Sequence, residues 1–230
     1  MISHKHKCIF IHIPKAAGTS VETVFLNDLE LDFEDKLPLL LGASTNLYME
    51  PRVISHLTAQ QMVDQHYISQ ELFDTYFKFA LVRNPVDRLF STYKYWGYGA
   101  VVSFDTFVKK ALPRLLEQPY RRFFLLPQTD YLYSNEGRLL VDKICYFERL
   151  NEDLRPVFRK AGIELDRVPH SNKAKPKANA FRGLKKAMEM PVLLKYLNLN
   201  QKRTKELSEE AIQVVRTIYA SDFDRLDYSI

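Results

Sequence analysis

Residues 14–20 read Pro-Lys-Ala-Ala-Gly-Thr-Ser, a run of small side chains with one lysine and two hydroxyls. Small residues let backbone N–H groups approach an anion closely, and a helix that begins here would add positive potential. Lys15 would contribute a full positive charge. The segment therefore predicts a phosphate cradle, and its candidate ligand-binding residues are Lys15, Ala17, Gly18, Thr19 and Ser20.

The cradle differs from the Walker A loop of ordinary ATPases and kinases. That motif places its lysine directly after its second glycine, whereas Lys15 precedes Gly18. The order of residues therefore counts against ATP chemistry. A tight turn with an incidental lysine is the alternative on this segment alone.

A second polar motif, Arg-Asn-Pro-Val-Asp-Arg-Leu-Phe-Ser, occupies residues 83–91. Arg83 and Arg88 could offer forked donors to a phosphate, and Ser91 a hydroxyl. In the competing interpretation Arg83 pairs with Asp87 and only caps its own helix.

Each motif follows a short apolar run, at 8–13 and at 77–82. Continuous apolar runs rich in β-branched residues are typical of strands covered on both faces of a parallel sheet. Helical spacing of apolar residues follows at 20–29 and 85–96, and Asn84 suits the N-cap of the second helix. Ligands bind at the carboxyl ends of strands in open α/β sheets, which is where both motifs fall.

Other patterns extend this alternation of strands and helices along the chain. It predicts a three-layer, P-loop-like α/β fold with a central, mostly parallel sheet flanked by helices, in one domain spanning residues 1–230. The further strands are expected at 52–55 and 141–146, the further helices at 104–116, 154–161 and 208–220, and a basic loop at 168–186.

Composition limits the class of protein. Apolar residues make up 46% of the 230 residues, enough for a folded core, so disorder is not expected. The net charge of +5 favours an anionic partner. Cys8 and Cys145 lie in apolar runs and are expected to be buried thiols, neither a disulfide nor a metal site.

No run is long enough to span a membrane. We expect a cytoplasmic protein, with peripheral attachment to a membrane or a lumenal domain cut from an anchored protein as alternatives.

Taken together, the motifs resemble those of a known family. IHIPKAAGTS and RNPVDRLFS are similar to the 5′-phosphosulfate and 3′-phosphate motifs of the sulfotransferases that use 3′-phosphoadenosine 5′-phosphosulfate (PAPS), in particular the carbohydrate sulfotransferases. Later landmarks of that group have counterparts in QTDYL, YFERL, VPHSNK and YASDFDRLDY, at residues 128–132, 146–150, 168–173 and 219–228.

The resemblance implies a role for each matching residue. Lys15 would bind the 5′-phosphosulfate and stabilise charge on the bridging oxygen as the sulfuryl group leaves. Residues 17–20 would hold the 5′-phosphate, and Arg83 and Ser91 the 3′-phosphate. Ala16 stands where the family usually has threonine, which removes one hydroxyl donor. The implied partners are PAPS as donor, without a metal, and a hydroxyl-bearing acceptor, expected to be a glycan.

An alcohol needs a base to remove its proton as it attacks. We assign this role to His56, because related sulfotransferases often place a histidine before a helix here and because its ordinary pKa suits proton transfer near neutrality. His12 adjoins the cradle but is expected to point into strand packing. His66 lies in a polar helical stretch, and His170 lies in the basic loop.

Two other regions remain open. Lys173 and Lys175 could close over the donor or receive an acidic acceptor, or they could belong to a solvated surface. Aromatic residues at 120–133 could line a sugar cleft, although such residues more often form core. The alternative functions are a P-loop-like small-molecule kinase and a noncatalytic nucleotide- or polyanion-binding module. No nucleic-acid partner is expected, since the RNA-binding patterns are missing from the sequence.

Overall fold

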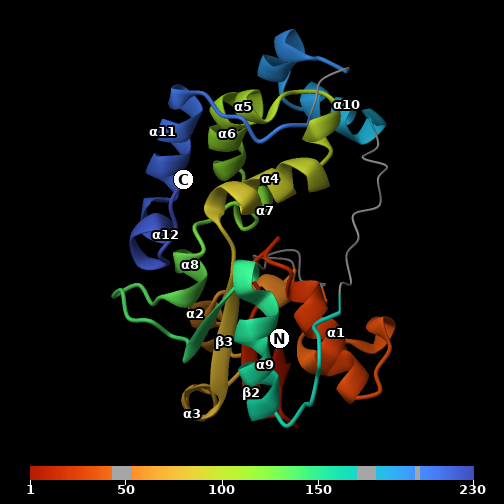
Figure 1. Ribbon diagram of the computed structural model, residues 1–230, viewed down its shortest axis with the longest axis vertical. Coiled ribbons are helices and arrows are strands. Elements are labelled where there is room, and N and C mark those ends of the chain that lie inside the picture. The colour runs from red at the N-terminus through yellow and green to blue at the C-terminus, as the bar shows by residue number, and fades with distance from the viewer. Residues whose placement is uncertain (43–52, 170–179, 200–202) are drawn as a thin grey trace. The chain divides into compact units, whose positions relative to one another are not determined.

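The computed structural model describes residues 1–42, 53–169, 180–199 and 203–230. The chain divides into two compact units (Figure 1). The first unit comprises Met1–Arg83 and Gln128–Lys173, and the second comprises Asn84–Pro127 and Ala174–Ile230.

The first unit is built on a four-stranded sheet. Its strands follow the order β1-β2-β3-β4, with β1 antiparallel to β2 and the other neighbours parallel. Parallel neighbours need crossover connections, which here contain helices. The predicted α/β class with a mostly parallel sheet is thus confirmed. The strands are β1 Ile2–Ser3, β2 Cys8–Ile11, β3 Phe77–Val82 and β4 Lys143–Tyr146.

Helices cover both faces of this sheet. Successive strand residues point to opposite faces, and β3 is buried along almost its whole length, so both faces need cover. On one face Phe10 and Phe79 share a core with residues of α1 and α9, and Figure 1 shows α2 on the other side of β3. The helices are α1 Gly18–Asp28, α2 Ala59–Asp64, α3 Gln70–Thr75, α8 Thr129–Leu132 and α9 Leu150–Lys160, with short 3₁₀ turns at Phe33–Asp35, Leu37–Leu39, Ile54–His56 and Phe147–Arg149.

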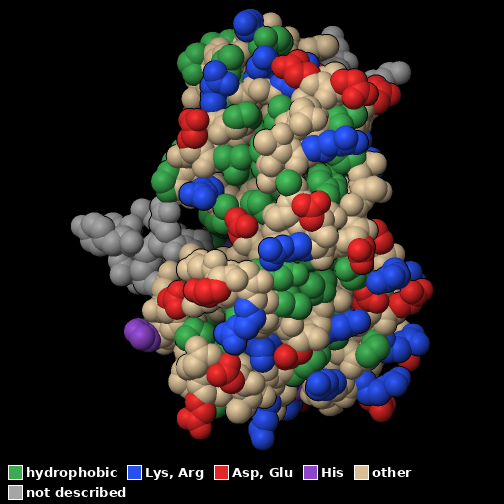
Figure 2. All heavy atoms as spheres, turned by 90° about the vertical axis from the view of Figure 1, so that its left-hand side faces the viewer, with side chains coloured by type: hydrophobic (Ala, Val, Ile, Leu, Met, Phe, Trp, Pro, Cys, Tyr) green, Lys and Arg blue, Asp and Glu red, His purple; other side chains and the backbone are tan. Residues whose placement is uncertain are grey.

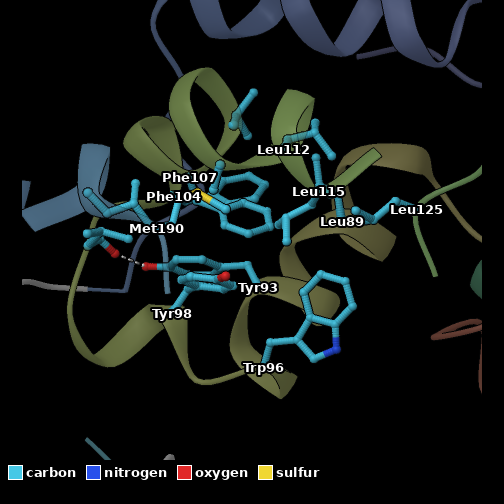
Figure 3. Packing of buried hydrophobic residues seen from close by; sticks show 14 of the residues in the cluster. Leu89, Tyr93, Trp96, Tyr98, Phe104, Phe107, Leu112, Leu115, Leu125 and Met190 are labelled. Atoms are coloured by element: carbon cyan, nitrogen blue, oxygen red, sulfur yellow. Dashed lines mark hydrogen bonds between the residues drawn. The ribbon is translucent and has the colours of Figure 1, made fainter. Parts of the chain in front are cut away.

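The second unit is helical in its described residues. Its elements are α4 Pro85–Tyr95, α5 Phe104–Thr106, a π-helical segment Phe107–Ala111, α6 Leu112–Leu116, α7 Pro119–Arg122, α10 Ala180–Met188, α11 Glu209–Ile218 and α12 Ala220–Arg225, with 3₁₀ segments at Tyr98–Ala100 and Pro191–Tyr196. Its core is rich in aromatic rings, among them Tyr93, Tyr98 and Phe107 (Figure 3). The Tyr93 hydroxyl donates to the Val102 carbonyl at 2.8 Å, which satisfies a buried polar group.

Helix α4 begins as the sequence predicts. The Asn84 side chain accepts hydrogen bonds from Val86 N and Asp87 N, and Pro85 occupies the first turn. The Asp87 carboxylate pairs with Lys205 at 2.5 Å.

Arg88 does not have the exposed position that a phosphate ligand needs. The residue is only 1% exposed, and its guanidinium donates to the carbonyls of Leu126 and Phe124 at 2.5 and 3.4 Å. The hypothesis that Arg88 binds phosphate is therefore wrong, because the guanidinium is buried inside the second unit and its Nη1 and Nη2 groups donate to backbone carbonyls.

Three predicted elements differ from the structure. Within 52–55, residues 53–55 form no strand, since Ile54–His56 is a 3₁₀ turn. The basic stretch 168–186 is not a loop throughout, because α10 begins at Ala180. The helix at 104–116 exists but widens into a π-helical segment before Pro113, a residue that lacks an N–H donor and crowds the preceding turn.

Both cysteines are buried free thiols, as predicted. Burial raises the pKa of each thiol to about 12, so neither is a ready nucleophile. Over the part of the chain described, no helix has the length and apolar character that crossing a bilayer requires. On the face drawn in Figure 2, basic side chains are interspersed with acidic ones.

Candidate functional site

The segment between β2 and α1 has an unusual backbone. Lys15 and Ala17 both adopt left-handed conformations, with φ of 66° and 68°, which is uncommon for residues with a side chain. Ala16 N donates to Ile13 O at 3.4 Å and Ser20 N donates to Ala17 O at 3.0 Å. Such strain is kept where the surrounding structure enforces it, often at ligand sites.

The start of α1 suits an anion. Its N-cap residue, Ala17, has no side chain to accept from the first N–H groups, and the first turn contains no acidic residue. A helix N-terminus without these groups presents partial positive charge. Lys15 and Thr19 are half-buried beside it and Ser20 is buried. These residues, with Ala17 and Gly18, thus form the loop and first turn that the sequence predicts as a cradle.

Gly18 is required by the packing of the loop against His12. A Cβ atom added at Gly18 would lie 2.0 Å from Cδ2 and 2.1 Å from Nε2 of the His12 ring, far inside van der Waals contact. The glycine therefore allows an imidazole to lie directly against the first turn of α1.

His56 lies at the end of the 3₁₀ turn Ile54–His56 and reaches the end of β2. Its Nδ1 is 3.0 Å from the carbonyl oxygen of His12. A carbonyl only accepts, so Nδ1 must donate, which places the imidazole lone pair on Nε2. Burial lowers the pKa of His56 well below its ordinary value of 6.5, and the neighbouring imidazole of His12 lowers it further. His56 is therefore a neutral imidazole near pH 7.

His12 has a larger part in the site than the sequence predicts. Its ring stacks on Phe10, as a packing residue would. However, its Nδ1 is also 2.5 Å from Oε1 of Glu22, and its ring meets the His56 ring edge to face at 4.4 Å between centroids. His12 thus connects α1, the cradle and His56.

Arg83 follows β3 and approaches the cradle within the first unit. Its Nη1 lies 3.5 Å from the carbonyl oxygen of Lys15, and its guanidinium lies over the Phe147 ring at 4.3 Å. The buried Gln128 holds the Arg83 backbone in both directions, accepting from its N at 2.9 Å and donating to its O at 2.8 Å. The carboxyl ends of β2 and β3 therefore bring Lys15 and Arg83 together.

Other predicted residues lie elsewhere. Ser91 is half-buried on α4 in the second unit. Lys173, Lys175 and His170 lie outside the described residues. His66 is exposed and lies two residues beyond the end of α2.

The aromatic stretch at 120–133 is not all available to a ligand. Tyr131 is 1% exposed, and Phe124 packs on the core of the second unit. In the described portions of the chain, no group of three or more His, Cys, Asp or Glu side chains is placed to hold a metal ion.

Three residues of the site carry roles that the sequence did not reveal. The sequence predicts only strand packing for His12, gives Gln128 only as part of a motif of the family, and does not distinguish Glu22 from other carboxylates of a helix. The signal in the sequence for Glu22 is its position next to the buried stripe Val21, Val24 and Phe25 of α1.

Comparison with known proteins identifies one family. Residues 1–229 match the family model described as "Sulfotransferase family". No curated protein and no solved structure matches the chain. The matched range includes the cradle, His56 and the motif that begins at Arg83.

Proposed function

The chain belongs to the sulfotransferase family, and we propose that it moves the sulfuryl group of PAPS to a hydroxyl of an acceptor, which we expect to be a carbohydrate. The observation that carries this proposal is that a candidate anion-binding loop and a candidate general base lie together at the end of β2. The cradle, which contains the positively charged Lys15, lies against the His12 ring. The neutral His56 donates to the His12 carbonyl at the same strand end.

We propose that the cradle binds the 5′-phosphosulfate of the donor. The uncapped first turn of α1 and the half-buried Lys15 supply N–H groups and positive charge, and Thr19 and Ser20 supply hydroxyls. When bound, PAPS supplies an activated sulfuryl group on a good leaving group. Lys15 would hold the bridging oxygen and stabilise the negative charge that grows there as the sulfur–oxygen bond breaks.

His56 would act on the acceptor. The hydrogen bond from Nδ1 to the His12 carbonyl leaves Nε2 as the basic nitrogen. We propose that Nε2 takes the proton of the acceptor hydroxyl as its oxygen forms the new bond to sulfur. The depressed pKa keeps His56 in the neutral form that this transfer requires. The main catalytic contributions would be in-line positioning and charge stabilisation, as in phosphoryl transfer.

The remaining donor contacts rest on the family resemblance. Arg83 and Ser91 would bind the 3′-phosphate, whose charge distinguishes PAPS from ATP. The geometry at Arg83 supports a cationic site near the cradle, through its approach to the Lys15 carbonyl. Lys173 and Lys175 would add donor or acceptor contacts. The carbohydrate preference comes from the resemblance alone.

Calorimetric titration with adenosine 3′,5′-bisphosphate, the product left by PAPS, tests the donor site. We expect the wild type to bind this nucleotide more tightly than ATP, and Lys15→Ala to weaken binding about tenfold to a hundredfold, the value of a charged hydrogen bond. Lys5→Ala is the matched control, because Lys5 is exposed and pairs with Asp28 away from the cradle. Equal affinity of the wild type and Lys15→Ala would contradict the cradle. A preference for ATP would favour a kinase, and nucleotide binding without transfer to any acceptor would favour a binding module.

A further inference from the structure

Glu22 is a buried carboxylate with a defined partner. Its side chain is 7% exposed, and it lies on α1 directly after the cradle. A carboxylate taken out of water is costly unless it is paired and hydrogen-bonded. The partner is His12, whose side chain is 9% exposed, at 2.5 Å between Nδ1 and Oε1. Separating the two side chains would leave a buried carboxylate unpaired, so the contact holds both in place.

The ring of His12 is constrained on several sides. It stacks on Phe10 with 5.6 Å between centroids, and it fills the space beside Gly18 where a Cβ would clash at 2.0 Å. The rings of His12 and His56 also meet edge to face, with an angle of 69° between their planes. A flip of the His12 ring would turn Nδ1 away from Glu22. The bond to Glu22 thus selects one orientation of a ring that touches both the cradle and His56.

We propose that Glu22 and His12 form a positioning pair that holds His56 in the orientation and tautomer of a base, an inference that rests on the proposed function. The His12 carbonyl accepts from Nδ1 of His56, and the His12 ring fixes the plane of the His56 ring. Glu22 fixes the His12 ring in turn. Because the pair acts through His56, both members are positioning residues. Small displacements of a reacting group can cost large factors in rate.

Substitutions at Glu22 separate positioning from folding. Glu22→Leu removes the acceptor while keeping an apolar side chain that suits the buried site, and we expect kcat to fall about tenfold to a hundredfold. Affinity for adenosine 3′,5′-bisphosphate should change by less than about threefold, since the cradle keeps its own groups. Glu22→Gln retains an amide oxygen that accepts from Nδ1 and should recover most of kcat. Glu152→Leu, an exposed carboxylate on α9, is the matched control.

Nitrogen NMR of ¹⁵N-histidine-labelled protein reads the positions of the protons directly. In the wild type, Nδ1 should carry the proton on both His12 and His56. In Glu22→Leu, the His56 signal should move toward a mixture of tautomers, which a merely structural role of Glu22 would not produce. A wild-type His56 protonated on Nε2 would overturn the proposal, and this measurement stands even if a variant fails to fold.

A double-mutant cycle tests the contact of the His12 ring with the cradle. Gly18→Ala should weaken binding of adenosine 3′,5′-bisphosphate because its Cβ must displace the His12 ring. His12→Ala makes room for that Cβ, so Gly18→Ala should cost markedly less in the His12→Ala background. Equal costs in the two backgrounds would contradict the proposed contact.

The outcomes distinguish this inference from the proposed function. If the wild type transfers sulfuryl groups while Glu22→Leu keeps both kcat and the His56 tautomer, the positioning pair is wrong and the function stands. If the wild type neither binds the bisphosphate nor transfers, the function fails, and the tautomer measurements still decide whether Glu22 and His12 orient His56.

Discussion

The cores of the two units differ in chemistry. The first unit buries polar and charged side chains among its apolar ones, including His12, Glu22 and Gln128, each with a specific hydrogen-bond partner. The second unit is packed around aromatic rings such as Tyr93 and Phe107. It also buries Asp222 and Arg88, and Arg88 donates to backbone carbonyls and lies over the Tyr219 ring. Buried polar groups cost free energy unless they are paired, so a cluster of them beside a cradle indicates a site shaped for chemistry.

This contrast predicts that substitutions in the two units differ in whether they mainly change turnover or mainly change stability. Substitutions around the cradle of the first unit should change turnover more than they change stability. Substitutions in the aromatic core of the second unit should do the reverse, because the cost there is lost packing and the cavity left behind. Each prediction below tests one side of this contrast.

The largest effect is expected from His56→Ala. Loss of a general base typically costs a factor of about 10² to 10⁴, so kcat should fall by that factor while binding of adenosine 3′,5′-bisphosphate is kept. Initial rates at saturating donor and acceptor measure it. His66→Asn is the control, since His66 is exposed and asparagine tolerates its positive φ of 59°. Unchanged turnover in His56→Ala would remove His56 as the base.

Phe107→Ala should affect stability instead. The side chain is fully buried among Tyr93, Tyr98 and Phe104, and its removal should lower the free energy of unfolding by about 3–5 kcal/mol. Denaturant titration measures this loss, with Met188→Ala as an exposed control in the same unit. Turnover per folded molecule should be retained at low temperature. If Phe107→Ala kept full stability and lost turnover, the expectation that this core serves stability would be contradicted.

The acid limb of the rate profile should lie below pH 6.5. Burial and the neighbouring His12 lower the pKa of His56 in the folded protein, so His56 stays neutral, and active, down to its depressed pKa. In the unfolded chain His56 has its ordinary, higher pKa, so it binds a proton at a higher pH than in the folded protein. The corresponding stability is therefore present above pH 6.5 and is lost as pH falls toward the folded pKa. Rate profiles and denaturant titrations of the wild type and His56→Ala across this range measure both effects; an acid limb above pH 6.5 would contradict the assignment.

The smallest effect is expected from Lys205→Ala. Lys205 pairs with Asp87 on the surface of the second unit, and its side chain is 54% exposed. Exposed ion pairs contribute about 1 kcal/mol or less and are screened by salt. Thermal unfolding at low and high salt should show a small loss that salt reduces further. A loss as large as that of Phe107→Ala would show that this pair has a structural role beyond the surface.

Sequence patterns predict the elements that depend on local signals. The buried runs at β2 and β3 and the Asn84 cap of α4 are predictable because burial on both faces and N-caps leave signatures in a few adjacent residues. The strand predicted at 52–55 is wrong because so short an apolar stretch also suits a buried turn, and Ile54 is buried in a 3₁₀ turn. The widened turn before Pro113 depends on backbone packing that periodicity does not record.

The candidate site was predictable only where its motifs are contiguous. Residues 14–20 stand together in the sequence, and the structure keeps them together. Glu22 and His12 meet because helix α1 folds back beside the end of β2, and Gln128 reaches Arg83 across 45 residues. These pairings depend on tertiary contacts, so the polar core could not be found from one sequence. The single domain at 1–230 and the donor and acceptor residues stay predictions.

The most direct test of the central claim is transfer of radiolabelled sulfuryl from PAPS to a panel of glycan and non-glycan hydroxyl acceptors. We predict labelled product on at least one glycan with the wild type, greatly reduced product with Lys15→Ala and with His56→Ala, and undiminished product with Lys5→Ala. Product formed as quickly by Lys15→Ala and His56→Ala as by the wild type would contradict the assignment of the cradle and His56 as the sulfuryl-transfer site.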